Sequence, residues 1–212
     1  HPWYYSPRLT PADNHPLSRN LNRIFSEFVS SVDTVSSDKN LNKTIILTTS
    51  PYARRVKSPS SVSLENINNP PARELFNQSF IPVGVLIEGE FRSVFENRMI
   101  ENLGVNTANF QSQGKQAKII VIADAGMVAN KVDYTRQPPQ IGEEMGYDRV
   151  SRQTFGNREF LMNAVYYLGN RNEIMQLRSR TFQLRLLDKV RLREEKAAWQ
   201  WFNIITPMFL IL

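Results

Sequence analysis

The chain has 212 residues, of which 41% are hydrophobic, and this is enough to form one large domain with a buried core. It contains no cysteine, which excludes a disulfide framework, thiolate metal sites and a cysteine nucleophile. The only two histidines, His1 and His15, lie in a proline-rich leader, so a zinc site or a histidine-based triad is not expected. A formal net charge of +6 would suit nucleic acid or anionic lipid as a partner.

The first elements along the chain are predicted to be an extended leader and a helix. Residues 1–16 carry four prolines and three aromatic residues, which favour an extended arm over the surface. After Ser18, a residue type that favours helix N-caps, apolar residues recur at helical spacing. This pattern predicts a helix that covers the core through Leu21, Ile24, Phe25, Phe28 and Val29.

Three apolar runs, at residues 43–49, 83–88 and 118–123, predict the strands of a sheet. The third run contains four consecutive β-branched aliphatic residues, Ile119 to Ile122, which leave no polar face for water. It therefore predicts an interior strand that is covered on both sides. Because helical segments separate the strands, the expected fold class is α/β, a three-layer domain with a mostly parallel sheet over residues 17–188.

The later segments predict a long loop and a strong helix. Residues 130–156 contain two adjacent prolines, three glycines from Gly142 onward and little periodicity, which indicates a surface loop. Loops of this length tend to be functional or mobile. Asn157 then caps a helix that ends at Gly169 and Asn170. Its apolar stripe is formed by Phe160, Leu161, Ala164, Val165 and Leu168.

Two carboxylates at the ends of predicted strands, Asp124 and Glu88, are the candidate ligand-binding residues. Open α/β sheets usually bind their ligands where strands end. Asp124 can instead cap the turn at Gly126, because Asp and Gly are the commonest turn residues. A phosphoacceptor site built from Asp124, Thr49 and Lys131 matches the sequence only weakly, since no paired acidic cluster for magnesium accompanies it.

No catalytic residue, metal site or cofactor site is predicted. The glycines do not form a phosphate-binding motif. Glu88 and Glu90 flank Gly89 and could be paired carboxylates, but no nearby sequence feature indicates a raised pKa. We therefore expect the chain not to be an enzyme.

The C-terminal region combines a basic stretch with an increasingly apolar tail. Residues 178–196 contain seven basic and three acidic residues, which supply +4 of the net charge. Such a run is more often a solvated face than a binding site. Here two tryptophans and an apolar run follow, which is the order found on entering a bilayer. Residues 189–212 are therefore predicted to form a juxtamembrane helix and a truncated transmembrane segment, with membrane-proximal Arg191, Arg193, Lys196, Trp199 and Trp201.

Other interpretations of this tail remain open. It could be an ordinary terminal helix that folds onto the domain, and the basic residues with interleaved aromatics could bind nucleic acid. Because the chain begins without methionine and stops inside an apolar run, we also expect it to be a piece of a longer protein.

Six ordered motifs run along nearly the whole chain, at residues 2–5, 14–21, 85–95, 156–165, 177–180 and 186–189. Together they resemble the C-terminal half of the GldG family, the auxiliary, substrate-binding-like components of gliding-motility-associated ABC transporters of Bacteroidetes. The resemblance implies an extracytoplasmic α/β region between two membrane segments, the second of which begins near Trp199. The first membrane segment and the other half of the soluble region would be missing here, so a ligand site shared between the halves would be incomplete.

The main hypothesis is thus a non-enzymatic extracytoplasmic accessory module of an ABC-transporter complex, linked to gliding motility or envelope transport. It would lie at the inner membrane with its soluble part on the periplasmic side. Its partners would be a permease, through it an ATPase, and membrane lipid at the C-terminus, with no nucleic acid and no cofactor. The alternatives are a small-molecule-binding α/β domain with its ligand near Asp124 and Glu88, and a basic nucleic-acid-binding domain.

Overall fold

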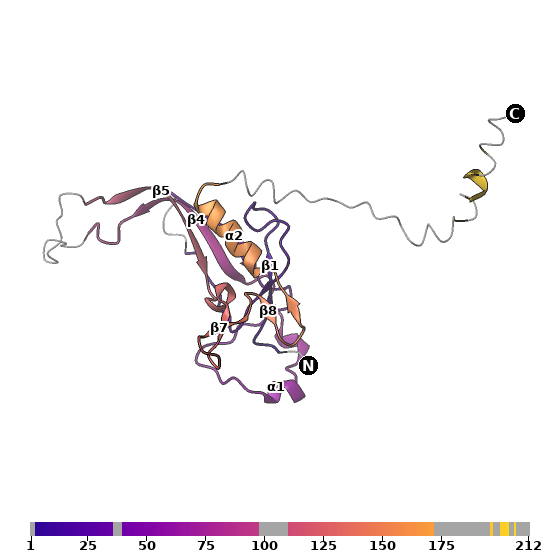
Figure 1. Cartoon of the computed structure of the whole chain (residues 1–212). Helices are drawn as coiled ribbons and strands as arrows, with labels where there is room; N and C mark the ends of the chain where they lie inside the picture. Colours follow the sequence, from indigo (N-terminus) through magenta and orange to yellow (C-terminus); the bar gives the residue numbers. More distant parts are fainter. Residues whose placement is uncertain are drawn as a thin grey trace. The chain divides into compact units, whose positions relative to one another are not determined.

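The computed structural model of the chain describes residues 3–35, 40–97 and 110–171, together with residues 196, 200–203 and 206 near the C-terminus. The chain divides into two compact units, His1–Ser179 and Arg180–Leu212. The sheets and helices described below belong to the first unit and are labelled along the chain in Figure 1.

The centre of the first unit is an antiparallel sheet of five strands in the order β2-β1-β3-β4-β5. β4 is the central long strand, because it pairs along most of its length with β3 on one side and with β5 on the other. The five strands are β1 (Arg8–Pro11), β2 (Ile24–Phe25), β3 (Leu41–Thr48), β4 (Pro82–Arg92) and β5 (Gln113–Ile122).

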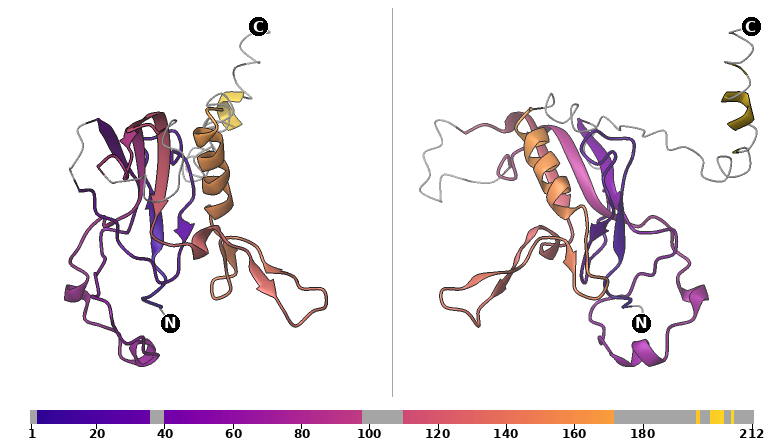
Figure 2. Two further views of the ribbon diagram at one scale, coloured as in Figure 1. Left: turned by 90° about the vertical axis from the view of Figure 1, so that its left-hand side faces the viewer. Right: turned by 45° about the vertical axis from the view of Figure 1, so that its right-hand side comes forward.

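Smaller elements surround this sheet. Figure 2 shows α2, the longest helix among the described residues, beside the sheet, and the hairpin of β6 and β7 projecting from the first unit. These elements are α1 (Glu65–Asn68), β6 (Lys131–Asp133), β7 (Gln140–Glu143), β8 (Tyr147–Asp148), β9 (Gln153–Thr154), α2 (Asn157–Leu168) and the 3-10 turns Arg73–Leu75 and Gly126–Val128.

The predicted three-layer α/β domain with a mostly parallel sheet is wrong. All neighbouring strands of the five-stranded sheet run antiparallel. Parallel neighbours need a crossover connection, usually a helix, and the helix expected at residues 18–29 does not form. Among the described residues of the first unit, α2 is the only helix that packs on the sheet, so the arrangement there has two layers.

Residues 18–29 form a turn and an extended segment that contains β2. Ser18 lies in the turn and not at a helix N-cap, and Asn20 and Phe28 have left-handed backbone angles, with φ of 59° and 54°. Such angles are incompatible with a right-handed helix. The apolar residues of this segment therefore diverge, since Ile24 is fully buried whereas Phe28 is exposed.

The predicted interior strand is the edge strand β5. Ile120 and Ile122 pack against the core, but on the other face Ile119 and Val121 are 43% and 40% exposed. An unbroken apolar run is buried on both faces only in a sheet that has a covering layer on each side. The second face of β5 stays accessible, so this run belongs to a half-buried antiparallel strand.

The proline-rich leader also enters the sheet. Residues 8–11 form β1, which lies between β2 and β3 and not over the surface, whereas residues 4–6 and 13–16 form turns and bends. Leu9 of this strand is fully buried. The preceding aromatic residues pack locally, and the rings of Tyr5 and Phe28 stack with centroids 5.9 Å apart.

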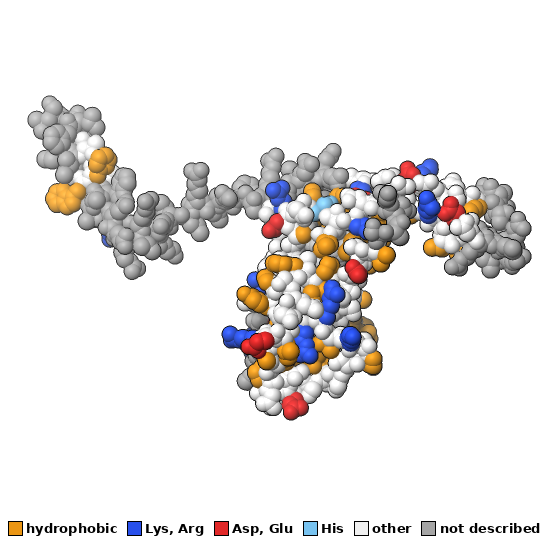
Figure 3. Space-filling view, turned by 180° about the vertical axis from the view of Figure 1, so that it is seen from behind, with side chains coloured by type: hydrophobic (Ala, Val, Ile, Leu, Met, Phe, Trp, Pro, Cys, Tyr) orange, Lys and Arg blue, Asp and Glu red, His pale blue; other side chains and the backbone are white. Residues whose placement is uncertain are grey.

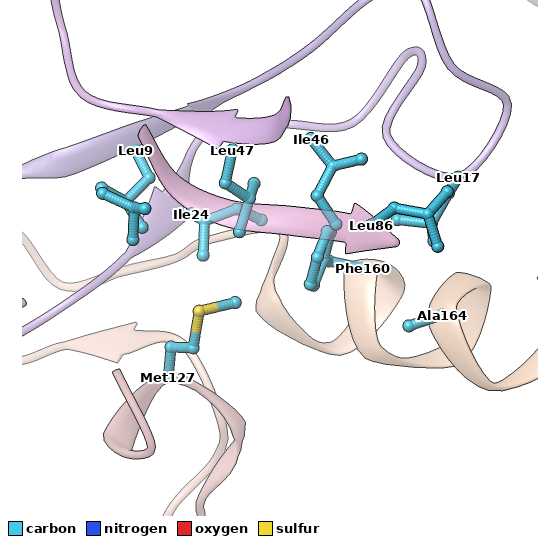
Figure 4. Packing of buried hydrophobic residues seen from close by; sticks show 10 residues of the cluster. Leu9, Leu17, Ile24, Ile46, Leu47, Leu86, Met127, Phe160 and Ala164 are labelled. Atoms are coloured by element: carbon cyan, nitrogen blue, oxygen red, sulfur yellow. The ribbon is translucent and has the colours of Figure 1, made fainter. Parts of the chain in front are cut away.

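The predicted helix at residues 157–168 is confirmed as α2, whereas the long loop expected at residues 130–156 contains the hairpins β6–β7 and β8–β9. The helix contributes Phe160 and Ala164 to the core shown in Figure 4, while Val165 and Leu168 of the predicted stripe are exposed. The buried apolar cluster comprises Leu9, Leu17, Ile24, Ile46, Leu47, Val83, Leu86, Met127, Phe160 and Ala164.

Asn157, the first residue of α2, closes one edge of the sheet. Its side-chain Oδ1 accepts a hydrogen bond from the backbone N–H of Phe25 at 2.9 Å, and its Nδ2 donates to the backbone oxygens of Phe25 at 2.8 Å and of Met127 at 2.9 Å. The amide thus occupies the place of a further strand beside β2. Gly146 makes room for it, because a Cβ there would lie 2.7 Å from Asn157 Oδ1.

The predicted membrane segment lies largely outside the described residues, and Arg191, Arg193 and Trp199 are among those not described. Lys196 and Trp201 are helical and exposed. Within the described part of the chain, no helix is both long enough and apolar enough to cross a bilayer. The predicted C-terminal helix entering the membrane is therefore not supported.

Asn157→Ala is expected to lower the free energy of unfolding by about 3 kcal/mol, because three hydrogen bonds are lost and buried backbone groups of β2 are left unpaired. Arg158→Ala, an exposed change in the same turn of α2, serves as the control and should shift stability by less than about 0.5 kcal/mol. Urea denaturation followed by circular dichroism measures both variants. Equal stabilities of the two would contradict the role assigned to Asn157.

Val121→Asp is expected to give a folded, cooperatively unfolding protein with a loss of about 1 kcal/mol, because the side chain points to the accessible face of an edge strand. Leu86→Asp, on the buried face of β4, should prevent folding, since an unpaired carboxylate in the core costs several kcal/mol. Thermal melts compare the two variants. An unfolded Val121→Asp protein would show that this face is covered.

Candidate functional site

The predicted candidate Glu88 lies in a polar cluster beside the C-terminal end of α2. Antiparallel pairing places it directly opposite Lys118 of β5, so both side chains share one face of the sheet. Tyr167, in the last turn of α2, donates its hydroxyl hydrogen bond to Glu88 Oε1 at 2.7 Å. Three segments that are distant in the sequence therefore meet at this carboxylate.

Lys118 joins β5 to the end of the helix. Its ammonium donates hydrogen bonds to Asn170 Oδ1 at 2.9 Å and to the backbone oxygen of Tyr167 at 3.4 Å. It also lies 4.1 Å from the centroid of the Tyr167 ring, within the range of a cation–π contact. A cation at this end of a helix complements the partial negative charge of the last carbonyls. Lys118 thus shares the Tyr167 carbonyl with the N–H of Asn170, which also donates to it.

His15 packs on the other side of the same tyrosine. Its ring meets that of Tyr167 edge-on, with centroids 4.9 Å apart, and its Nδ1 accepts a hydrogen bond from the backbone N–H of Leu17 at 3.2 Å. Burial lowers the pKa of His15 below its ordinary value, and the charge of Lys118 lowers it further against the opposing effect of Glu88. An unprotonated Nδ1 is the form that this turn requires.

The cluster is arranged to hold a proton and not to transfer one. Burial and the hydrogen bond to Glu88 raise the pKa of Tyr167 to about 12. At neutral pH the phenol therefore stays protonated and acts as a donor, not as a base or nucleophile. Within the described residues, no group of three His, Asp or Glu side chains is placed to hold a metal ion.

The second predicted candidate, Asp124, lies away from this cluster. Its Oδ1 accepts a hydrogen bond from the backbone N–H of Gly126 at 2.8 Å, which is the turn cap that the sequence allowed. Its Oδ2 accepts one from the backbone N–H of Glu27 at 3.2 Å. Glu88 lies opposite Lys118, and the distance along the chain from there to Asp124 corresponds to about 20 Å of strand. The structure does not bring the two carboxylates together.

A second charged cluster, which the sequence did not reveal, lies beside β2. The guanidinium of Arg8 is 4.6 Å from the ring centroids of both Phe25 and Phe155, and it pairs with Asp148 at 2.6 Å. Burial alone would raise the pKa of Asp148, but hydrogen bonds from the following turn and the charge of Arg8 hold it below its ordinary value. This pair fastens the β8–β9 hairpin to β1.

A small pocket adjoins this region. Lys131 lines it and lies 3.4 Å from a carboxylate oxygen of Glu27 and 3.9 Å from one of the buried Glu143. The pocket has a volume of about 20 Å³, enough for a single water molecule. Small-molecule sites usually enclose roughly 300 to 1,000 Å³, so this pocket cannot hold such a ligand.

Sequence reasoning found Glu88 but not its partners. Lys118 lies opposite Glu88 because β4 and β5 pair in antiparallel register. The predicted parallel sheet gave no reason to place these two residues together. His15 was set aside as part of the leader. Tyr167 could have been found from the sequence, because on the predicted helix it follows Ala164 by three residues and so lies on the same face, which was expected to cover the sheet.

The fold defines a β-rich module, and the charged side chains of its two clusters hold its own segments together. Over residues 1–164, the chain matches a family of auxiliary components described as an ABC-type uncharacterized transport system. The match covers more than half of the sequence, and the chain therefore belongs to this family. No curated protein and no solved structure matches it.

Tyr167→Phe is expected to lower the free energy of unfolding by about 1 kcal/mol near neutral pH, because it removes the hydrogen bond to Glu88 and keeps the ring contacts. Tyrosine ionises near pH 10 in the unfolded chain but at about 12 in this fold, so the folded state binds the proton more tightly. The stabilisation is complete below pH 10 and is lost between about pH 10 and 12.

Urea denaturation of the wild type and of Tyr167→Phe at neutral pH and near pH 12 measures this effect. The difference in stability should shrink or reverse at the higher pH. Tyr52→Phe, at an exposed tyrosine, is the control and should change neither the stability nor its pH dependence. A wild type and a Tyr167→Phe variant with parallel pH profiles would contradict the assignment.

Proposed function

We propose that the chain is a non-enzymatic, extracytoplasmic auxiliary module of an ABC transport complex. The observation that carries this proposal is the family match over residues 1–164. Within the complex the module would bind a permease and, through it, act with an ATPase. Its contribution would be to hold and recognise partners, because its described polar clusters serve as structural ties.

The lack of an enzymatic role is supported by the chemistry of the Glu88 cluster. Tyr167 retains its proton at neutral pH, and Glu88 already accepts a hydrogen bond from it. Lys118 is likewise engaged with Asn170. These groups are committed to one another, so none of them is presented as a free base or nucleophile.

The finer part of the proposal rests on the sequence. The ordered motifs that resemble the GldG family support a link to gliding motility or envelope transport, and a place at the inner membrane with the soluble part on the periplasmic side. The basic and aromatic residues Arg191, Arg193, Lys196, Trp199 and Trp201 would contact anionic lipid at the membrane surface.

The two alternative functions gain less support. The pocket beside Lys131 is too small for a small-molecule ligand. On the face of the molecule shown in Figure 3, the described Lys and Arg side chains are interspersed with Asp and Glu, whereas nucleic-acid binders gather basic residues into one patch or stripe. A role in a transport complex is therefore better supported than either small-molecule binding or nucleic-acid binding.

Affinity purification from detergent-solubilised membranes of the native host tests the proposal. The tagged wild-type protein is expected to retain a permease and an ATPase through washes at high salt, and Leu86→Asp, which is expected not to fold, should retain neither. Protease treatment of spheroplasts should digest the module while the cytoplasmic ATPase survives. Recovery of the wild type without permease or ATPase would overturn the proposed function.

A further inference from the structure

The two edges of the five-stranded sheet differ in a way that indicates a binding surface. The amide of Asn157 occupies the β2 edge and pairs with both backbone groups of Phe25. At the opposite edge, β5 has β4 as its single strand neighbour among the described residues. An unpaired strand edge is a ready template for another strand.

The direction of the free backbone groups on β5 follows from one hydrogen bond. The N–H of Ala123 donates to the oxygen of Val83 at 3.0 Å, so it points toward β4. Backbone groups alternate in direction along an antiparallel strand, and those of Gln116, Lys118 and Ile120 therefore point outward. Between Gly84 and Glu90 the β4–β5 register is continuous, which keeps this row regular.

The devices that usually block an open edge are weak here. Proteins protect edges with proline, bulges and lysine side chains, and β5 contains no proline. Its register shift lies between Gln113 and Gln116, opposite Glu90 and Arg92 of β4, and it leaves the strand regular from Gln116 to Ile122. Lys118 does not shield the edge, because its ammonium is held on the α2 side by Asn170.

The sheet face next to this edge is aliphatic and positively charged. Ile45 of β3 and Val121 of β5 both pair with Val85 of β4, so these three side chains lie on one face together with Ile119. Val85 is buried between its neighbours, whereas Ile45 is 38% exposed. Lys43 of β3 lies on this face, because it pairs with Ile87, which pairs with Ile119, and its ammonium donates a hydrogen bond to the backbone oxygen of Val35. Lys115 of β5 is exposed and lies at the register shift next to Gln116. Glu88 of β4 points to the opposite face, toward α2.

We propose that the β5 edge binds an extended strand of a partner protein by main-chain hydrogen bonding. The partner strand would carry aliphatic side chains beside Ile119 and Val121 and an acidic side chain beside Lys115. A second copy of the chain fits less well, because two β5 strands side by side would bring lysines together and supply no acid. The site goes beyond the proposed function and does not depend on which complex the chain joins.

The probe is a short fluorescent peptide with valine at alternate positions near one end and a glutamate on the same face near the other. A matched peptide carries lysine in place of the glutamate. The full 212-residue chain is expected to bind the glutamate peptide saturably by fluorescence anisotropy, and to bind the lysine peptide more weakly. Failure of the wild type to bind the glutamate peptide would overturn the proposal.

Two pairs of variants locate the site. Gln116→Pro removes an outward N–H from an exposed position and should weaken binding about tenfold or more, whereas Gln116→Ala should bind as the wild type does. Lys115→Glu, which leaves the backbone unchanged, should reverse the preference between the two peptides, and Lys115→Ala should remove it.

Three outcomes decide against the proposal. Undiminished binding to a folded Gln116→Pro protein would show that the backbone of β5 is not used. An unchanged preference in Lys115→Glu would exclude the charge contact independently of how Gln116→Pro folds. Sedimentation that shows a wild-type dimer and a Gln116→Pro monomer would make a second copy of the chain the occupant. None of these experiments involves the permease or the ATPase, so they fail or succeed separately from the test of the proposed function.

Discussion

The side-chain amide of Asn157 is the contact on which the arrangement of the first unit depends. A strand edge presents alternating donors and acceptors, and a primary amide is the side chain that offers both in one plane. Here it pairs with both backbone groups of Phe25 and uses its second N–H for the oxygen of Met127. One fully buried side chain therefore joins β2, the 3-10 turn and α2, and both of its N–H groups and its oxygen are hydrogen-bonded.

A corresponding set of contacts fixes the other end of the helix. Tyr167 is bonded to Glu88 on β4, and Lys118 on β5 holds Asn170 just beyond the helix. Between these ends, Phe160 and Ala164 pack into the core. A helix that is fixed at both ends has one orientation on the sheet, because fully satisfied polar networks select a single arrangement where apolar packing alone allows several. The charged residues of this cluster thus fix the orientation of α2 on the sheet.

The sequence predicted local structure better than it predicted pairing. All three predicted apolar runs are strands, and the helix at residues 157–168 is correct, because periodicity reports on neighbours along the chain. The predicted cap is wrong, since Gly156 is the N-cap and Asn157 is the first helical residue. Strand direction depends on contacts between distant segments, and the apolar residues around Ile24 are explained equally well by a helix or by an extended chain that reaches the core. The four aliphatic residues of β5 were misleading for the same reason, since composition cannot tell whether a second layer covers Ile119 and Val121.

For the candidate site too, the sequence identified single residues and not the contacts between distant segments. Glu88 was found because it stands near a predicted strand end, yet its chemistry is decided by Lys118, Tyr167 and His15, which come from other segments. Asp124 was chosen by the same rule and proved to cap its own turn. The rule belongs to parallel sheets, in which the ends of several strands meet at one edge. In an antiparallel sheet, neighbouring strands end on opposite sides, so two strand-end carboxylates are separated and not gathered.

An auxiliary component of a transport system needs recognition more than it needs chemistry, and the first unit is organised accordingly. The charged residues of its two clusters are paired internally, and one sheet edge is closed by Asn157. Among the described residues, β5 has one strand neighbour and an unpaired edge, on a sheet that is already ordered by β3, β4 and α2. A strand that adds to a preformed edge must order only itself, because the receiving side loses little conformational freedom on binding. Main-chain hydrogen bonds then provide affinity for any extended segment, and the side chains beside them, Ile119 and Lys115, provide selectivity among such segments.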